Sequence, residues 1–472
     1  MDYKQKYLKY KQKYLKLLKD QKGGEPFLMD ILAGLVFSYL FERNQRQLQL
    51  FYTGGLPVMV QPLGNFTLNP RYRLKLLGRS SISVILATRL LQGEIRKGKL
   101  QLANRIVSRM HELPKISRPT LATTFDSSEG WHRNSLVSVV FHPILPLLAT
   151  GFRDNPVKLW RLVNTPSSKW VVINKEMPRR GGYSTDILSV AFHGTAPLLA
   201  TGSSDTTVQL WHFSSNGSEA TCVTTLDSSN NGHSDWVWSV AFHSTLPLLA
   251  SGSSDGITKL WRLDNPNGSA ATCMATLDSS NDGHRSIVKS VAFHPTLPLL
   301  ATGSYDTNVK LWHLDKPDGS MWRATCVTTL DRSKGGHNNG VCSVAFHSTL
   351  SLLATGSYDN TVKLWHMVYT PNGSISVATC VATLDSSNGG HSGSVNSVAF
   401  HPTLPFLATG SDDKTAKLWR LDNPDGSAAT CVATLDRDKG GHNASIRSVA
   451  FHQRLPLLVT GSDDSIVKLW KL

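Results

Sequence analysis

Cysteine is scarce in this chain of 472 residues. Its six cysteines are too few for a disulfide scaffold in a chain of this length. No Cys-x-x-Cys pair and no cysteine–histidine spacing typical of a zinc site occurs. We therefore expect free thiols and an intracellular, cytoplasmic protein.

Long hydrophobic runs are also missing. The most apolar early stretch, residues 27–41, contains Asp30 and is shorter than the ~20 residues that a membrane-spanning helix needs. The lysine- and tyrosine-rich start does not resemble a signal peptide. We predict no transmembrane segment and no secretion signal.

Acidic residues are few in the first quarter of the chain. Residues 1–118 contain 22 lysines and arginines against 7 acidic residues, whereas residues 119–472 contain 27 of each. An affinity for nucleic acid based on charge is therefore expected only of residues 1–118. A hydrophobic content of 40% excludes a largely disordered chain.

Internal repetition dominates the sequence after residue 119. A Lys-Leu-Trp or similar triplet recurs seven times at intervals of 50 to 54 residues. Each copy also contains, in a constant order, a Ser-Val-Ala-Phe-His-like run, a Leu-Leu-Ala-Thr-Gly-Ser-like run and an aspartate. The chain therefore contains seven copies of one structural unit.

Each repeat predicts four short β-strands. In one copy, residues 290–294 alternate apolar and polar side chains, and residues 299–303 form an apolar run suited to burial on both faces. A turn at 304–307 precedes strands at 309–314 and 324–330. Such strands are stable only when several sheets pack together, so we predict an all-β, seven-bladed β-propeller.

The repeat resembles the WD-repeat family of β-propellers in its Gly-His pairs, turn aspartates and tryptophans. In that family a histidine, a serine or threonine, an aspartate and a tryptophan form a hydrogen-bonded network that stiffens each blade. The resemblance implies this role for five sets: His233, Ser251, Asp255 and Trp261; His284, Thr302, Asp306 and Trp312; His337, Thr355, Asp359 and Trp365; His391, Thr409, Asp413 and Trp419; His442, Thr460, Asp464 and Trp470.

The first two repeats depart from this pattern. Trp131-His132 and Gly182-Tyr183 stand where the later copies have Gly-His. We expect these two blades to lack part of the network.

Ring closure follows from counting strands. The chain stops two residues after Trp470, so the last repeat lacks its fourth strand, while residues 120–126 resemble the fourth-strand segment 430–436. We predict that strand 120–126 pairs with the last blade and closes a propeller formed by residues 119–472.

The 17 histidines do not indicate a catalytic or metal site. Most recur once per repeat, and residues copied in this way lie on a circle instead of converging at one point. No GxSxG, P-loop, HExxH or kinase motif occurs. We predict a non-enzymatic protein without catalytic residues, metal or cofactor.

Positions that differ between repeats are candidates for a partner-binding surface. They flank the apolar residue four places after each histidine and precede each turn aspartate, and in the WD-repeat family they surround the mouth of the central channel. Aromatic and basic residues at such positions are typical of protein interfaces. The candidates for docking other proteins or peptides are Trp236, Trp238, Lys289, Tyr305, Tyr358 and Arg447. The alternative is that the tryptophans pack on neighbouring loops.

The basic region before the propeller has two parts. Residues 1–24 contain a duplicated Tyr-Lys-Gln-Lys-Tyr-Leu-Lys heptad and end in Gly-Gly. This segment resembles the N-termini of giant DNA virus proteins, which implies an infected host cell as location and leaves virion packaging open. A solvated helix or tail is the alternative.

Residues 25–118 are expected to form a small, mainly helical region. Residues 30–40 resemble the opening helix of an F-box, and residues 102–113 have a basic, amphipathic pattern. We predict a protein-interaction scaffold or adaptor. The alternatives are an F-box-like ubiquitin-ligase adaptor and a nucleic-acid-associated protein that uses residues 1–118, which otherwise engage a second protein.

Overall fold

The computed structural model describes residues 119–125, 134–153, 155–162, 170–174, 185–214, 219–316, 322–370 and 373–472. The predictions for residues 1–24 and 25–118, including the helix at 30–40, lie outside the described residues. So do His132 and Tyr183 of the first two repeats.

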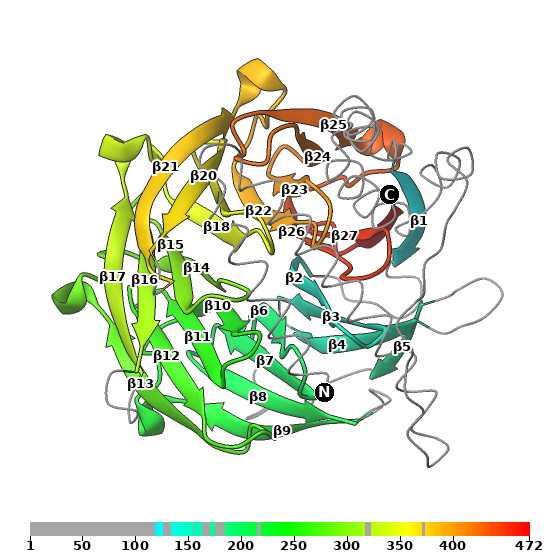
Figure 1. Ribbon diagram of the computed structural model, residues 1–472. Coiled ribbons are helices and arrows are strands. Elements are labelled where there is room, and N and C mark those ends of the chain that lie inside the picture. The colour runs from blue at the N-terminus through cyan, green and yellow to red at the C-terminus, as the bar shows by residue number, and fades with distance from the viewer. Residues whose placement is uncertain are drawn as a thin grey trace, which may run out of the picture. The chain divides into compact units, whose positions relative to one another are not determined.

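Seven four-stranded antiparallel sheets form the blades of a ring (Figure 1). The first three blades consist of β2 (Leu136–Phe141), β3 (Leu147–Phe152), β4 (Asn155–Leu162) and β5 (Trp170–Asn174); β6 (Ile187–Phe192), β7 (Leu198–Ser203), β8 (Val208–Phe213) and β9 (Ala220–Leu226); and β10 (Val237–Phe242), β11 (Leu248–Ser253), β12 (Thr258–Leu263) and β13 (Ala271–Leu277).

The next three blades have the same strand order. They consist of β14 (Val288–Phe293), β15 (Leu299–Ser304), β16 (Val309–Asp315) and β17 (Arg323–Leu330); β18 (Val341–Phe346), β19 (Leu352–Ser357), β20 (Val362–Tyr369) and β21 (Ile375–Leu384); and β22 (Val395–Phe400), β23 (Phe406–Ser411), β24 (Ala416–Leu421) and β25 (Ala429–Leu435). The predicted all-β, seven-bladed fold is confirmed.

The seventh blade joins the two ends of the repeat region. It consists of β26 (Ile446–Phe451), β27 (Leu457–Ser462), β28 (Val467–Lys471) and, as its fourth strand, β1 (Thr120–Phe125). β1 runs antiparallel to β28, with Thr120 opposite Lys471 and Phe125 opposite Val467. The strand expected at residues 120–126 therefore takes the place that β25 takes in the sixth blade.

Short 3-10 helices connect the later blades. They are η2 (Ser228–Asn230), η3 (Ser279–Asn281), η4 (Arg332–Lys334), η5 (Ser386–Asn388) and η6 (Arg437–Lys439). Each begins after an aspartate whose carboxylate accepts a backbone N–H of the helix. The Asp-Ser-Ser-Asn-like segments of the sequence thus build the turns that lead to each Gly-His pair.

The hydrophobic core lies between adjacent blades. Every residue of β15 is buried, as expected for an apolar run that is covered on both faces. Leu299, Leu311 and Val341 belong to one core cluster that joins the fourth blade to the fifth. Gly303 marks the closest approach, since a Cβ atom at this position would lie 2.8 Å from Val341 Cγ1.

A ring of hydrogen bonds joins the innermost strands. In each blade the backbone N–H of a valine donates to a serine Oγ of the preceding blade, at 3.0 to 3.2 Å. The bond from Val139 to Ser448 joins the first blade to the seventh in the same way as the other six. The serine of each Ser-Val-Ala-Phe-His-like run is therefore a link between blades.

A second ring lies at the other end of these strands. The histidine that ends each run packs edge-on against the phenylalanine of the next blade, with ring centroids 4.9 to 5.2 Å apart. The seven histidines are His142, His193, His243, His294, His347, His401 and His452. They are structural, as the argument from their recurrence predicts.

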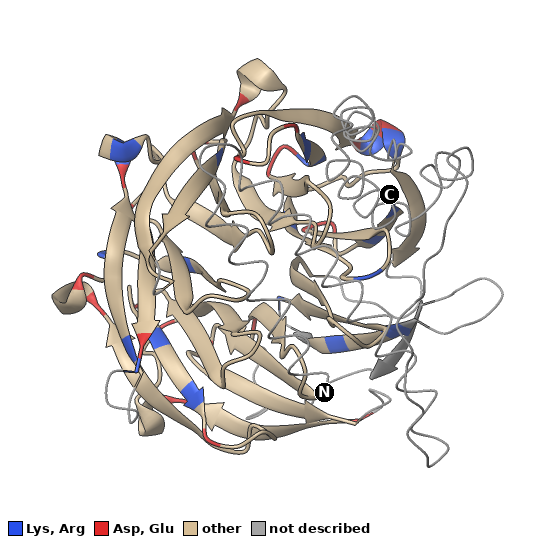
Figure 2. Ribbon diagram, viewed as in Figure 1, with Lys and Arg blue, Asp and Glu red and all other residues tan. Residues whose placement is uncertain are grey.

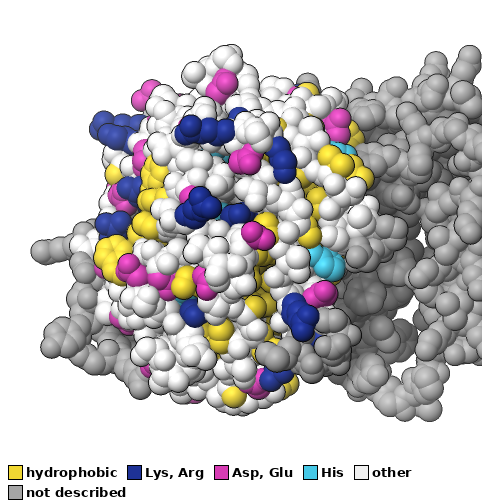
Figure 3. Space-filling view, turned by 90° about the vertical axis from the view of Figure 1, so that its left-hand side faces the viewer, with side chains coloured by type: hydrophobic (Ala, Val, Ile, Leu, Met, Phe, Trp, Pro, Cys, Tyr) yellow, Lys and Arg dark blue, Asp and Glu magenta, His cyan; other side chains and the backbone are white. Residues whose placement is uncertain are grey.

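Charge is mixed over the described part of the propeller. Lysines and arginines alternate with acidic residues around the ring without a continuous region of one sign (Figure 2). The outer wall near β17 and β21 likewise mixes both signs with bands of apolar side chains (Figure 3). Within the described residues, no helix is both long and apolar enough to span a membrane.

Candidate partner-docking face

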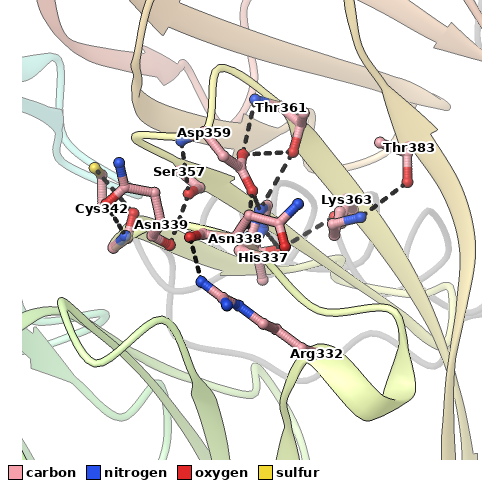
Figure 4. A network of polar contacts seen from close by, with 12 residues as sticks. Arg332, His337, Asn338, Asn339, Cys342, Ser357, Asp359, Thr361, Lys363 and Thr383 are labelled. Atoms are coloured by element: carbon pink, nitrogen blue, oxygen red, sulfur yellow. Dashed lines mark hydrogen bonds and ion pairs between the residues drawn. The ribbon is translucent and has the colours of Figure 1, made fainter.

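In five blades of the described part, a four-residue network holds the loop that leads into the inner strand. In the fifth blade His337 Nδ1 lies 2.9 Å from Asp359 Oδ2, and His337 Nε2 lies 2.7 Å from Thr355 Oγ1. The indole Nε1–H of Trp365 donates to the same Thr355 oxygen at 3.0 Å. Figure 4 shows His337 and Asp359 with their neighbours in this network.

The same arrangement recurs in all five blades for which it was expected. The histidine–aspartate distances are 2.8 to 3.0 Å and the histidine–hydroxyl distances are 2.7 to 2.8 Å. In all seven blades the tryptophan donates to the serine or threonine at 2.9 to 3.2 Å. The equivalent histidine position of the first two blades lies outside the described residues.

The network satisfies every polar atom when the histidine is neutral. Indole Nε1 only donates, so Thr355 Oγ1 accepts from Trp365 and donates its own proton to His337 Nε2. Nδ1–H of His337 then donates to the Asp359 carboxylate. Burial by itself would raise the pKa of Asp359, but hydrogen bonds from His337, Thr361 and the Asn338 backbone outweigh it and leave the pKa lowered.

This network also fixes the loop that carries the candidate surface residues. The Asp359 carboxylate accepts the backbone N–H of Asn338 at 2.9 Å, and Ser357 Oγ donates to the Asn339 carbonyl at 3.0 Å (Figure 4). The loop before the strand and the turn after the next strand are thereby tied together. Residues on both are therefore presented in one defined geometry.

Four of the six predicted surface residues form a continuous chain across three blades. Trp238 Nε1 donates to Ser254 Oγ at 2.7 Å, and Lys289 Nζ lies 2.8 Å above the centre of the Trp238 ring. The same ammonium is 5.8 Å from the centre of the Tyr305 ring. Tyr305 and Tyr358 are joined through their hydroxyl groups at 2.5 Å.

Burial shifts the pKa values of Lys289, Tyr305, Tyr358 and the neighbouring Cys342. It lowers the pKa of Lys289 to about 7, helped by the charges of Arg447 and Arg153 and opposed by Cys342. Burial also raises the pKa of Cys342 to about 12 and raises the pKa of Tyr305 and Tyr358. The contact with the Trp238 face favours the ammonium form of Lys289 and so opposes this lowering of its pKa.

Arg447 has acidic partners. Its guanidinium lies 2.9 Å from Asp412 and 2.5 Å from Asp463, and Asn396 donates to Asp412 at 2.8 Å. Asp412, Asp463 and Ser254 were not among the site residues predicted from the sequence. The available signal was their position before the turn aspartates, which is the position that Tyr305 and Tyr358 occupy.

Trp236 differs from the other five because its side chain remains available. It is 43% exposed, and its ring is tilted against Trp238 with centroids 5.6 Å apart. Trp238 is hydrogen-bonded to Ser254 and covered by Lys289. The alternative prediction, that the tryptophans pack on neighbouring residues, therefore holds for Trp238. The site is therefore an internally bonded platform with one projecting aromatic side chain.

Among the described residues, no three histidine, cysteine or acidic side chains come together as metal ligands. All six cysteines are free. The described face contains an exposed indole at Trp236, a cation–π contact between Lys289 and Trp238, and the ion pairs of Arg447.

Comparison with known proteins decides the family. The model described as "WD domain, G-beta repeat" matches residues 177–212, 220–262, 271–313, 324–366, 378–420 and 429–471, which together cover more than half of the chain. The chain belongs to the WD-repeat family. The first blade, β2 to β5, is not matched by the family model although it has the same strand order.

Relatives of this WD-repeat protein have diverse names. This chain is 30% identical over 412 residues to "Nuclear distribution protein PAC1" of Arthroderma otae, and the match covers 80% of this chain and 70% of that protein. It is 32% identical over 183 residues to "Pre-mRNA-processing factor 19" of Oryza sativa subsp. japonica, covering 39% of this chain and only 30% of that protein. The solved WD40 propeller domain of Doa1 matches with a TM-score of 0.54 at 21% identity, covering 75% of this chain and 96% of that one, which supports the fold alone.

Proposed function

We propose that this WD-repeat protein is a non-enzymatic scaffold or adaptor of the cytoplasm. It docks another protein or peptide on the channel-mouth platform, which we define as Trp236, Trp238, Lys289, Tyr305, Tyr358 and Arg447. The observation that carries the proposal is the 43% exposure of Trp236 beside Trp238, on a loop that the blade network holds in place. Large aromatic side chains on a preorganised surface dominate the binding energy of many interfaces.

The electrostatics of the platform support a partner that inserts apolar or aromatic groups. Arg447 is already matched by Asp412 and Asp463, and Lys289 is matched by the Trp238 face. A partner therefore does not need to supply an opposite charge to these groups. Burial of the Trp236 side chain remains as the main source of affinity, about 2 kcal/mol or more when such an anchor is fully covered.

The family relationship supports a scaffold more than it supports any one process. The relatives are named for nuclear distribution and for pre-mRNA processing. Because the chain spans only 30% of the rice protein, activities of that whole protein are not transferred to this chain. The shared element is the propeller, which binds partners with residues that differ between repeats.

The test compares Trp236→Ala with Ile144→Ala in the full-length chain. Ile144 is 46% exposed and lies in the turn after β2, at the end of the inner strand away from the histidine–aspartate networks. Affinity purification with nuclease and quantitative mass spectrometry should show partners that bind wild type and Ile144→Ala equally and lose at least tenfold with Trp236→Ala. Unchanged capture by Trp236→Ala, at unchanged melting temperature, would exclude the platform as the docking site.

We infer a second candidate function from the charge distribution. Residues 1–118 hold the whole net charge of +15, which favours nucleic-acid binding by this region. Binding should then fall steeply with salt and disappear when residues 1–118 are deleted. The F-box-like adaptor role and the viral origin rest on residues outside the described part and stay predictions. Copurification of ubiquitin-ligase components would support the F-box-like role.

A further inference from the structure

A groove opens on the third blade, beside the outer strand β13. It lies between the segment that contains η2 and the outer strand β13, and its volume is about 450 Å³. Its lining residues are Ser228, Asn231, Gly232, His233, Ser234, Lys259, Cys273, Met274, Ala275 and Thr276. No aspartate or glutamate is among these lining residues.

Lys259 of β12 is the only charged side chain in the lining that is not part of a blade network. It is 7% exposed, and within the described part of the chain its ammonium makes no hydrogen bond or ion pair. The side chain is largely covered, but the ammonium nitrogen itself is accessible to solvent and can stay hydrated. The groove gives this group its contact with solvent.

The repeats provide an internal comparison for this lysine. At the same position in the next three blades Lys310, Lys363 and Lys417 donate to a threonine hydroxyl of the outer strand, at 3.2 to 3.4 Å. In the seventh blade Lys468 donates to the carbonyls of Gly440 and Gly441. Lys259 has neither kind of partner, so its charge remains available to an acceptor from outside the chain.

The other polar groups of the groove are donors that suit an oxyanion. Ser228 and Ser234 are exposed and their hydroxyl groups have no internal acceptor among the described residues. Among the described residues, Thr276 Oγ1 has a polar contact only with the Cys273 sulfur, at 3.9 Å. The His233 ring is already bonded to Asp255 and Ser251 and therefore adds no further donor.

We propose that this groove binds a phosphate group, with Lys259 supplying the charge and the hydroxyls of Ser228, Ser234 and Thr276 donating to its oxygens. A charge-assisted bond to a phosphate oxygen is stronger than one to a neutral acceptor, and it gives the Lys259 ammonium the partner that it lacks within the described residues. The phosphate belongs either to the free ion or to a phosphorylated side chain. The site adjoins the platform, because Ser234 is two residues from Trp236 and its backbone N–H donates to Asp255 of the same blade network.

The test uses the full-length chain and a matched lysine. Lys259→Met and Lys363→Met are titrated with inorganic phosphate and with O-phosphoserine by calorimetry at constant ionic strength. We expect the affinity for phosphate to fall about tenfold in Lys259→Met and less than twofold in Lys363→Met. Lys363 Nζ already donates a hydrogen bond to Thr383 Oγ1 (Figure 4). The basic residues 1–118 contribute the same background to both variants, and the tighter of the two ligands identifies the source of the phosphate.

Two outcomes overturn the proposal: equal affinity of wild type and Lys259→Met, or an equal loss in the two lysine variants. A second measurement covers the case in which Lys259→Met does not fold. In wild type, phosphate should slow the acetylation of Lys259 at least threefold, followed by mass spectrometry, and leave Lys363 unchanged. Equal acetylation of Lys259 with and without phosphate would also exclude the site.

Discussion

At the scale of single residues, one hydroxyl oxygen connects each blade's network. Thr355 Oγ1 bonds both His337 Nε2 and Trp365 Nε1, and all three side chains are fully or almost fully buried. Thr355→Val keeps the volume but leaves the indole N–H without a partner. We expect the free energy of unfolding to fall by about 2 to 4 kcal/mol, measured by urea denaturation.

The chain itself supplies the control for this prediction. The third blade has Ser251 at the position of Thr355 and makes the same two bonds. Thr355→Ser should therefore cost only the lost methyl group, about 1 kcal/mol. If Thr355→Val and Thr355→Ser were equally stable, the hydroxyl would not be important for the blade.

The position of the candidate site could be predicted from the sequence, but the bonds between its residues could not. The repeat pattern located Trp238, Lys289, Tyr305 and Tyr358 at one surface. It did not reveal that Tyr305 bonds Tyr358, 53 positions away, or that Arg447 pairs with Asp412, 35 positions away. These contacts cross from one blade to the next, so they depend on side-chain geometry that the pattern of a single repeat does not contain.

At the scale of elements, the repeats are longer than the ~40 to 45 residues typical of this family. Part of the extra length forms hairpins that reach the preceding blade. In the hairpin between β24 and β25, Gly426 has φ of 74° and a Cβ atom there would lie 2.9 Å from Leu352 of the fifth blade. The added residues of this hairpin therefore lie against the preceding blade.

The closing strand β1 is the element whose removal is most informative. Deleting residues 119–126 from the full chain would expose the edge of β28, which then presents unpaired backbone groups to other molecules. We expect dimers or aggregates by size-exclusion chromatography with light scattering, together with a lower melting temperature. Phe125 also packs on Trp160 of the first blade, with centroids 4.9 Å apart, and this contact would be lost.

A deletion of equal length in the heptad segment, residues 3–10, is the control for this experiment. It shortens the chain without touching a described strand. A monomeric 119–126 deletion with the melting temperature of this control would show that the ring does not depend on β1.

At the scale of the whole molecule, the ring of seven histidines predicts sensitivity to acid. Each Nδ1 accepts two backbone N–H groups of the following turn, so it carries no proton. Burial lowers the pKa of His142, His294, His347 and His401 to about 4 and lowers the pKa of the other three.

The sign of the effect follows from proton linkage. Unfolded histidine has a pKa of about 6.5, so between pH 6.5 and about 4 the unfolded chain binds protons that the folded ring excludes. The contribution of these histidines to the free energy of unfolding is fully present above pH 6.5. It is lost as the pH falls toward 4, by up to about 1.4 kcal/mol per pH unit for each histidine. The urea midpoint at pH 7.5, 5.5 and 4.5 measures this loss.

The aspartates of the blade networks do not account for a loss in this range. The pKa of Asp255, Asp306 and Asp464 is lowered by hydrogen bonds that outweigh burial, so their contribution is lost only in more acidic solution. A urea midpoint that stays constant from pH 6.5 to 4.5 would contradict the assignment of the histidines as excluded proton acceptors.

The sequence by itself determined the strands, the number of blades and the composition of each blade network. These properties repeat every 50 to 54 residues, and local periodicity and turn chemistry are enough to specify them. Only the tertiary structure decided which platform residues bond one another, that Trp236 alone projects among the tryptophans of the platform, and that Lys259 lacks the partner its counterparts have. Such contacts depend on the packing of side chains between and within blades, which the repeat pattern does not specify.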